Sequence, residues 1–180
     1  NGNPAGTNYY VEYSSDNFLT INESGTMAQT SVDIGPPIQP NTTFYFHVRA
    51  VNRAGLQTAF DITVATPTLA AAPSSLGLTA VGAGAVTAVW GANTNAPGSR
   101  FAVWAATDPA FGTLTASSQT ANTLAVFSGL SSNNTYYFQV RAINNNGVPT
   151  AFVSLNSTST LASPPIAAAF SNITASNIQA

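Results

Sequence analysis

Residues 44–50 alternate between apolar and polar side chains, so that Phe44, Phe46 and Val48 share one face of an extended segment. A period of two is typical of a half-buried β-strand. Residues 136–142 repeat the pattern, and helical periodicity of useful length is absent from the sequence. The pattern predicts an all-β protein. Further strand candidates lie at residues 9–13, 75–80, 86–90, 101–105 and 124–127.

The chain repeats itself at an offset of 92 residues. When residues 38–60 are laid over residues 130–152, 12 of the 23 positions are identical. This spacing is longer than the repeat of a helical solenoid and matches the length of a small β-sandwich domain. The chain is therefore predicted to be a piece of a tandem array of such domains.

The register of the repeat predicts one whole unit between two partial ones. Asn1 falls in register with Asn93, which lies well inside the unit, and residues 170–180 fall in register with residues 78–88. The first unit is thus expected to lack its opening strands, and a third unit is expected to begin with the same strands. The predicted boundaries are residues 1–69 for the first partial unit, 70–162 for the complete unit and 163–180 for the start of the third.

Composition narrows the range of partners. Charged residues make up 6% of the chain, all four basic residues are arginine, and the formal net charge is −2. A phosphate-neutralising surface for nucleic acid is not expected from so few cations. Because lysines often keep sheet edges from pairing with other chains, their absence favours assembly. There is no cysteine for a disulfide or thiolate, and no run of about 18 apolar residues that would span a membrane.

One stretch of the second unit carries a resemblance. Residues 130–136 run from a leucine to a Thr-Tyr pair, Val140, Ala142 and Asn144 follow at alternate positions, and Trp90 lies in the strand predicted near the start of the unit. This pattern resembles the fibronectin type III family, in which such a tyrosine begins strand F and a tryptophan on strand B is buried. The resemblance implies tandem immunoglobulin-like β-sandwiches, with strands C to G in the first partial unit and strands A and part of B in the third.

The resemblance has one departure and a functional implication. Position 44 is Phe where the family has its corner tyrosine, so the hydroxyl bond back to the preceding loop is expected only at Tyr136. The family serves mostly as a spacer, adhesion and assembly module and has no common catalytic site. Because fold alone does not supply function, the side chains have to be weighed separately.

No residue pattern indicates catalysis, a cofactor or a metal ion. The sequence contains no metal-ligand cluster, phosphate-binding loop or nucleophile paired with a base. His47 is the single histidine, and its strand phase predicts a solvated outer position and not a ligand or base. Asp16 and Asp108 occupy matching turns. Their carboxylates are expected to bond to the turn backbone and not to act as acid catalysts. The chain is predicted not to be an enzyme.

The candidate binding surface lies on the outer face of strands C and F. In the first unit Glu12 is expected beside Arg49, and in the second Trp104 beside Arg141, so that an ion pair is replaced by an arginine stacked on an indole. Local packing, an assembly contact and a platform for glycans are all consistent with this pattern. The predicted surface comprises Tyr10, Glu12, Tyr45, Arg49, Trp104, Tyr137 and Arg141.

These observations lead to a functional hypothesis of a non-catalytic structural module in an extracellular or cell-surface array or filament. Its partners would be adjacent repeats of a longer chain or other copies joined head-to-tail, with the C-terminal strands of one copy completing the first partial unit of the next. The alternative is an adhesin or a carbohydrate-binding accessory module of a secreted enzyme. The predicted strand-completing residues are Ile166, Phe170, Ile173 and Ile178.

Overall fold

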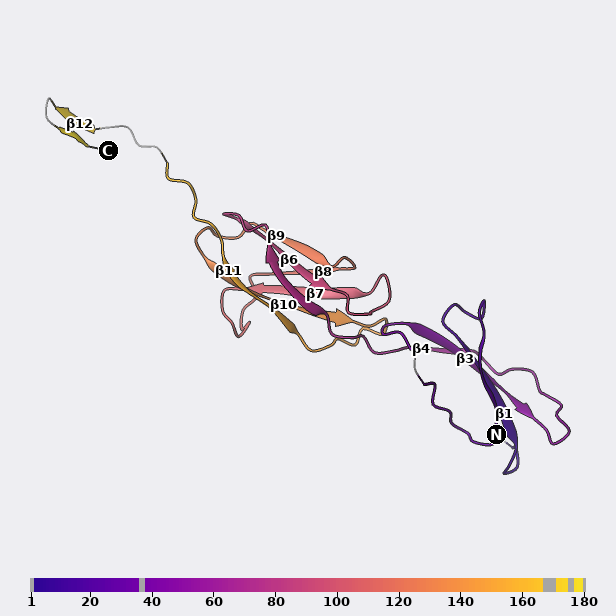
Figure 1. Cartoon of the computed structure of the whole chain (residues 1–180). Helices are drawn as coiled ribbons and strands as arrows, with labels where there is room; N and C mark the ends of the chain where they lie inside the picture. Colours follow the sequence, from indigo (N-terminus) through magenta and orange to yellow (C-terminus); the bar gives the residue numbers. More distant parts are fainter. Residues whose placement is uncertain (1, 36–37, 167–170, 175–176, 180) are drawn as a thin grey trace.

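The computed structural model of the chain describes residues 2–35, 38–166, 171–174 and 177–179, and the described residues form β-strands and turns with no helix (Figure 1). The strands pair antiparallel throughout. The prediction of an all-β chain is therefore confirmed.

Seven strands form a complete two-sheet sandwich, hereafter the complete unit. One sheet has the order β5-β6-β9 and the other the order β11-β10-β7-β8, which is the arrangement of a fibronectin type III-like fold. The strands are β5 (Ser74–Thr79), β6 (Ala85–Gly91), β7 (Arg100–Ala106), β8 (Ala116–Thr120), β9 (Leu124–Ser128), β10 (Thr135–Ile143) and β11 (Val153–Ser159).

The core of the complete unit follows from strand alternation. Every second side chain of β6 and β10 is buried, and among them are Trp90 and Phe138. The ring of Trp90 meets Phe101 edge-on at 5.7 Å, and Phe127 meets Phe138 in the same way at 5.3 Å. Such edge-to-face pairs add to the stability that burial gives. The buried position expected for Trp90 is confirmed.

The corner tyrosine of the complete unit is present as the resemblance implied. Tyr136 is buried, and its hydroxyl accepts a hydrogen bond of 2.9 Å from the backbone N–H of Ser131. This bond ties the start of β10 to the loop before it. At the equivalent position 44 the phenylalanine has no hydroxyl with which to make the bond.

The N-terminal residues form a single sheet, hereafter the partial unit. Its order is β2-β1-β3-β4, with β1 (Asn8–Ser14), β2 (Asn22–Met27), β3 (Thr43–Val51) and β4 (Val64–Pro67). Tyr9 of β1 pairs with Ala50 of β3. Their counterparts 92 residues later, Phe101 of β7 and Ala142 of β10, pair in the same way. Four strands of the repeat therefore fold alike in both units.

The described residues of one segment of the partial unit differ from their repeat counterparts. Residues 32–36 are the repeat counterparts of β9, yet the described residues 31–35 belong to no strand. In the complete unit β9 pairs with β6. Among the described residues of the partial unit no segment takes the place of β6, so the counterpart of β9 has no backbone partner there. The assignment of strands C to G to residues 1–69 stays a prediction.

The C-terminal hairpin pairs β12 (Ser171–Thr174) with β13 (Asn177–Gln179). Its register pairs Ser171 with Gln179. Shifted back by one repeat, these positions are Thr79 and Thr87, which pair in the same way between β5 and β6. The hairpin therefore reproduces the pairing that opens the complete unit.

Substituting equivalent core residues is expected to affect the two units differently. Phe138 is 1% exposed, whereas Phe46 at the same repeat position is only half-buried. Phe138→Ala should lower the free energy of unfolding by about 3–5 kcal/mol, the usual cost of emptying a buried aromatic site. Both tryptophans lie in the complete unit, so denaturant unfolding followed by tryptophan fluorescence measures that unit. Phe46→Ala is the control and should leave this transition unchanged; an equal loss from it would contradict the separate cores.

Candidate assembly surface

Among the described residues, no second sheet covers the apolar inner face of the partial unit. Val11 and Val48 are half-buried, whereas their repeat counterparts Val103 and Val140 are completely buried beneath the second sheet. The residues are of the same type and in the same register, so their different burial reflects the second sheet, which covers only the complete unit among the described residues. An apolar sheet face of this kind normally requires a covering layer.

The uncovered face contains a groove. It has a volume of about 280 Å³ and is lined by side chains from β1, β2 and β3 and from residues 29–32, with Tyr9, Met27 and Val32 among them. Farther along the same face the rings of Tyr13, Phe44 and Phe46 lie 6.2–6.5 Å apart. The open face therefore offers both a hollow and an aromatic cluster to a covering segment.

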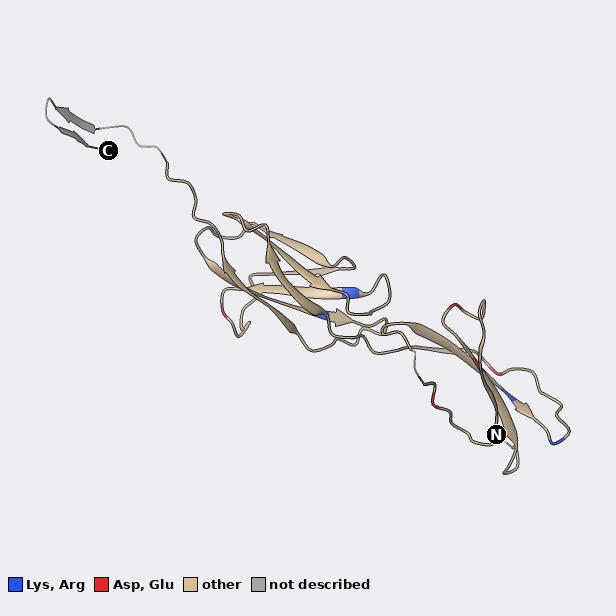
Figure 2. Ribbon diagram, viewed as in Figure 1, with Lys and Arg blue, Asp and Glu red and all other residues tan. Residues whose placement is uncertain are grey.

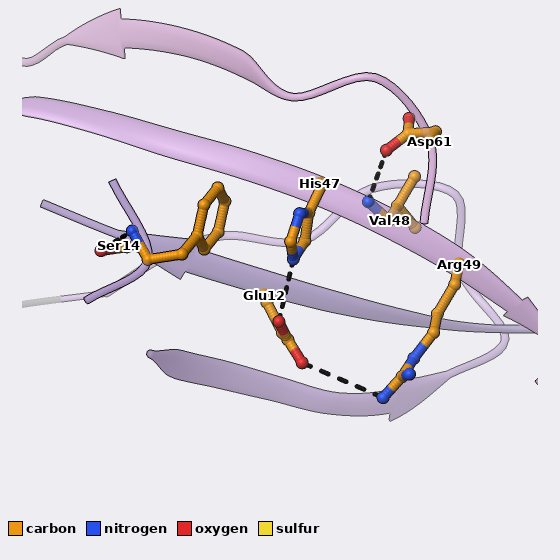
Figure 3. Close-up of polar contacts among 7 residues, drawn as sticks. Glu12, Ser14, His47, Val48, Arg49 and Asp61 are labelled. Carbon is orange, nitrogen blue, oxygen red and sulfur yellow. Dashed lines mark hydrogen bonds and ion pairs between the residues drawn. The ribbon is translucent and has the colours of Figure 1, made fainter. Parts of the chain in front are cut away.

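The outer face of the partial unit is a packed polar cluster, shown in Figure 3. A carboxylate oxygen of Glu12 lies 2.8 Å from Nε2 of His47, which is directly opposite in the strand pairing, and the other lies 3.9 Å from Nη2 of Arg49. The expected neighbours Glu12 and Arg49 thus meet, but the shorter contact is to the histidine. Glu12 is buried despite its charge, because both neighbours can satisfy it.

The prediction that His47 is solvated is wrong. Its ring points to the outer face as the strand phase required, but it is stacked between Phe18 at 4.0 Å and Phe60 at 3.7 Å. These phenylalanines come from the segments after β1 and before β4, and they cover the histidine from both sides. Strand alternation reports which face a residue occupies and carries no information about loops that fold over that face.

Each arginine of this surface lies between two aromatic rings. Cζ of Arg49 is 4.7 Å from the centre of Tyr10 and 4.4 Å from Phe60. In the complete unit Cζ of Arg141 is 5.3 Å from Trp104 and 4.5 Å from Phe152. Such cation–π contacts contribute about 0.5–1 kcal/mol at exposed sites. Stacking of an arginine on aromatic rings therefore contributes to the order of the outer face in both units.

Sequence reasoning missed Phe60 and Phe152, although they are identical positions of the repeat and close its most similar stretch. Of the residues predicted for this surface, Glu12 is buried and the others are half-buried. Of the predicted strand-completing residues, Ile166 is 95% exposed, Ile173 lies in β12, Ile178 lies in β13, and Phe170 lies outside the described residues. Binding by either set stays a prediction.

The turn acids have the structural role expected of them. Asp16 accepts a hydrogen bond of 2.6 Å from the hydroxyl of Ser14 and one of 2.8 Å from the N–H of Thr20. Asp108 accepts a bond of 2.8 Å from the N–H of Ala110. The hydroxyl of Ser14 and then the Thr20 amide lower the pKa of Asp16 below its ordinary value, because they stabilise the carboxylate.

The charges are few and scattered along the two units (Figure 2). Within the part of the chain that the structure describes, no group of three or more histidine or acidic side chains is placed to hold a metal ion. No helix long and apolar enough to cross a membrane is present among the described residues.

Comparison with known proteins gives no family assignment: no family model matches the chain, and no curated protein matches it. Among solved structures, the FN1–FN3 domains of chicken CNTN1 are similar at 18% sequence identity and a TM-score of 0.36. The match covers 83% of this chain and 55% of that one, so the chain spans about half the length of that structure.

Removing the Ser14 hydroxyl should raise the pKa of Asp16. In Ser14→Ala the largest stabilising bond to the carboxylate is lost, so its titration midpoint should move up toward 3.8. A carboxylate with a lowered pKa stabilises the fold above its unfolded pKa, and this contribution disappears as the pH falls through the folded value. Carboxyl NMR titration of the variant measures the shift. Ser15→Ala is the neighbouring control, and an unchanged midpoint in Ser14→Ala would contradict the assignment.

Shortening Phe152 should weaken the complete unit. Phe152→Leu removes a ring that lies 4.3 Å from Trp104 and carries Arg141 on its face. The loss of one aromatic pair and one cation–π contact should cost about 1–2 kcal/mol of unfolding free energy. Tryptophan fluorescence detects both the lower denaturation midpoint and the changed surroundings of Trp104. Phe60→Leu makes the same change in the partial unit and should leave the tryptophan transition of the complete unit unchanged. A loss of equal size in that transition would argue against local stacking as the cause.

Proposed function

We propose that this chain is a non-catalytic structural module of an extracellular or cell-surface filament, in which the C-terminal hairpin of one copy completes the partial unit of the next. The observation that carries the proposal is the uncovered inner face of the partial unit. The resemblance to fibronectin type III domains favours a spacer or assembly role and a location outside the cell.

The register of the hairpin supports this proposal. In the complete unit β5 and β6 supply the strands that cover β7 and β10, and Val86 of β6 is completely buried between the sheets. Ile178 is the repeat counterpart of Val86 and lies in β13. Full burial of such a side chain stabilises by about 1.5–3 kcal/mol. The added strands would also give the unpaired counterpart of β9 a backbone partner.

Chain geometry favours pairing between copies. The N–H of Leu161 bonds to Gly82, at the end of the complete unit where β5 turns into β6, whereas the partial unit contacts the opposite end through Ser99 and Asn145. Residues 161–170 span at most about 35 Å. Because β10 alone runs for nine residues, or about 30 Å, this linker would have to be almost fully extended to reach even the near edge of the open face of the same chain.

Head-to-tail pairing between different surfaces need not close into a ring. Each copy would present one open face and one hairpin, so both are used at every joint and one of each is left at the ends of any assembly. Such a heterologous contact generates an open fibre unless its rotation happens to close. This property makes a filament the expected product.

The alternative, an adhesin or carbohydrate-binding module, would use the aromatic outer face. There Trp104 is half-buried, Phe152 lies against it and Arg141 stacks on it. These contacts supply a local role for the ring and favour packing over a platform for sugars. Trp104→Ala separates the two functions: loss of glycan binding with intact assembly would support the alternative.

A charge at the core position of the hairpin should abolish assembly. Ile178→Asp would place a carboxylate where Val86 is buried in the complete unit, and an unpaired buried charge is strongly destabilising. Sedimentation velocity on the full chain should show concentration-dependent polymers for the wild type and monomers for this variant. Because the variant keeps its open face, adding it to the wild type should shorten the polymers.

The matched control is Gln179→Glu. It adds the same charge one position along the strand, where the side chain of the repeat counterpart Thr87 is not in the core. This variant should assemble like the wild type. Polymers of Ile178→Asp as long as those of the wild type, or a wild-type chain that stays monomeric at high concentration, would refute the proposed mechanism.

A further inference from the structure

The contact between the partial and complete units is centred on one asparagine. Asn41 is 2% exposed, and its side-chain amide is used on both sides: Nδ2 donates to Oγ of Ser99 at 2.7 Å, and Oδ1 accepts from the backbone N–H of Asn145 at 2.8 Å. Both partners belong to loops of the complete unit. A buried amide with both ends bonded across a joint fixes the two units in one orientation.

Two further asparagines bind the backbone at this joint. Nδ2 of Asn144 donates to the carbonyl of Thr68 at 3.3 Å. Asn95 holds the linker between the units, because its Oδ1 accepts from the N–H of Ala71 at 2.8 Å and its Nδ2 donates to the carbonyl of the same residue at 2.7 Å. Asn95 and Asn144 are both buried. The joint is therefore a polar interface with specific geometry.

The end of the complete unit opposite the internal joint carries the same donor group at Asn133. Asn133 is the repeat counterpart of Asn41, with a φ of 52° against 54°, and its N–H bonds to Leu161 at 3.0 Å as that of Asn41 bonds to Leu69 at 3.1 Å. The backbone thus presents both side chains alike. Asn133, however, is exposed.

The end of the partial unit opposite the internal joint carries the matching acceptor group. Oγ1 of Thr7 donates to the carbonyl of Pro4 at 2.8 Å, as Oγ of Ser99 donates to Ala96 at 2.6 Å. The loop at Asn52 has the turn of its counterpart Asn144: Oδ1 of each accepts two backbone N–H groups, from residues 54 and 56 in one case and 146 and 148 in the other.

This end is also hollowed. A cavity of about 610 Å³ is lined by residues that include Asn3, Thr7, Asn52 and Arg53. Asn3 and Asn52 are exposed, whereas their counterparts Asn95 and Asn144 are buried at the internal joint. The hollow therefore lies where the internal joint is filled by the neighbouring unit.

We propose that Asn133 of one copy docks into this hollow of a second copy and reproduces the internal joint, donating to Oγ1 of Thr7 and accepting from the N–H of Arg53. The inference rests on the proposed head-to-tail function and identifies its second contact. Residues 161–165, which lead to the hairpin, are the counterparts of residues 69–73, which lead from the internal joint to β5. The docking of Asn133 into the hollow, hereafter the pole contact, is thus compatible with strand exchange in a single joint.

Two sequence differences define how the new joint would depart from the internal one. The N–H of Ala96 bonds to the carbonyl of Pro40 at 3.1 Å, but its counterpart Pro4 has no N–H to donate. Nδ2 of Asn145 donates to Oγ1 of Thr43 at 3.2 Å, and its counterpart Arg53 supplies a guanidinium with several donors in that position. One backbone bond is lost, and a longer, charged donor replaces an amide.

The first test removes the asparagine amide. Asn133→Ala in the full chain should weaken self-association, measured by sedimentation velocity, by about tenfold or more, because two hydrogen bonds are lost and two partners are left unsatisfied. Asn156→Ala is the matched control: Asn156 is also an exposed asparagine with a positive φ, of 70°. The control should associate within about twofold of the wild type, and equal weakening of both variants would overturn the proposal.

The second test asks whether Asn133 and Thr7 touch between copies. Thr7→Val removes the hydroxyl with little change in shape, and combining it with Asn133→Ala should cost less than the sum of the two single changes. Because the chain has no cysteine, a copy with Asn133→Cys and a copy with Thr7→Cys should form one specific disulfide under oxidation. The pair Asn41→Cys and Ser99→Cys within one chain tests the same geometry at the internal joint.

The outcomes separate the pole contact from strand exchange. If Ile178→Asp abolishes assembly while Asn133→Ala leaves it unchanged and the cysteines do not couple, strand exchange stands and the pole contact is wrong. If the wild-type chain does not associate at all, both proposals fail. Weakening by Asn133→Ala alone, coupling to Thr7 and a specific disulfide together support the pole contact.

Discussion

An apolar sheet face must be covered, and the rest of this structure depends on how that requirement is met. In the complete unit the β5-β6-β9 sheet covers β7 and β10, so that Val103 and Val140 are completely buried. The partial unit has the same inner face in the same register and leaves Val11 and Val48 half-buried. The unmet requirement explains why residues 31–35 form no strand and why a groove lies on this face.

The outer face of the β1–β3 sheet and that of the β7–β10 sheet are each covered in part by side chains of the same unit. Arg49 and Arg141 each lie between two aromatic rings, and the second ring in each case comes from a segment next to the sheet, Phe60 or Phe152. A guanidinium retains most of its charge interaction on a ring face while its planar body packs. In the complete unit this stacking orders the outer surface at the position where Glu12 of the partial unit is replaced by Trp104.

The ends of the units at which joints form carry asparagine because of its backbone conformation and its side-chain amide. An asparagine tolerates the left-handed conformation, as Asn41 and Asn133 do, and its amide can donate and accept at once. Placed between two units, it bonds a hydroxyl on one side and a backbone N–H on the other. Directional polar contacts of this kind set orientation, whereas apolar burial supplies most of the affinity. A filament built in this way would combine strand exchange for strength with pole contacts for a fixed angle between successive units.

The sequence alone determined seven of the strands, the repeat and the buried position of Trp90, because alternation and self-similarity are local or one-dimensional signals. It also placed Glu12 and Arg49 on one face. Only the tertiary structure decided that His47 is enclosed by Phe18 and Phe60, since loops that fold over a face leave no periodic signal. The same holds for the joint at Asn41. Its burial depends on two units meeting, and repeat-related asparagines of identical local structure become buried or exposed according to what lies beyond them.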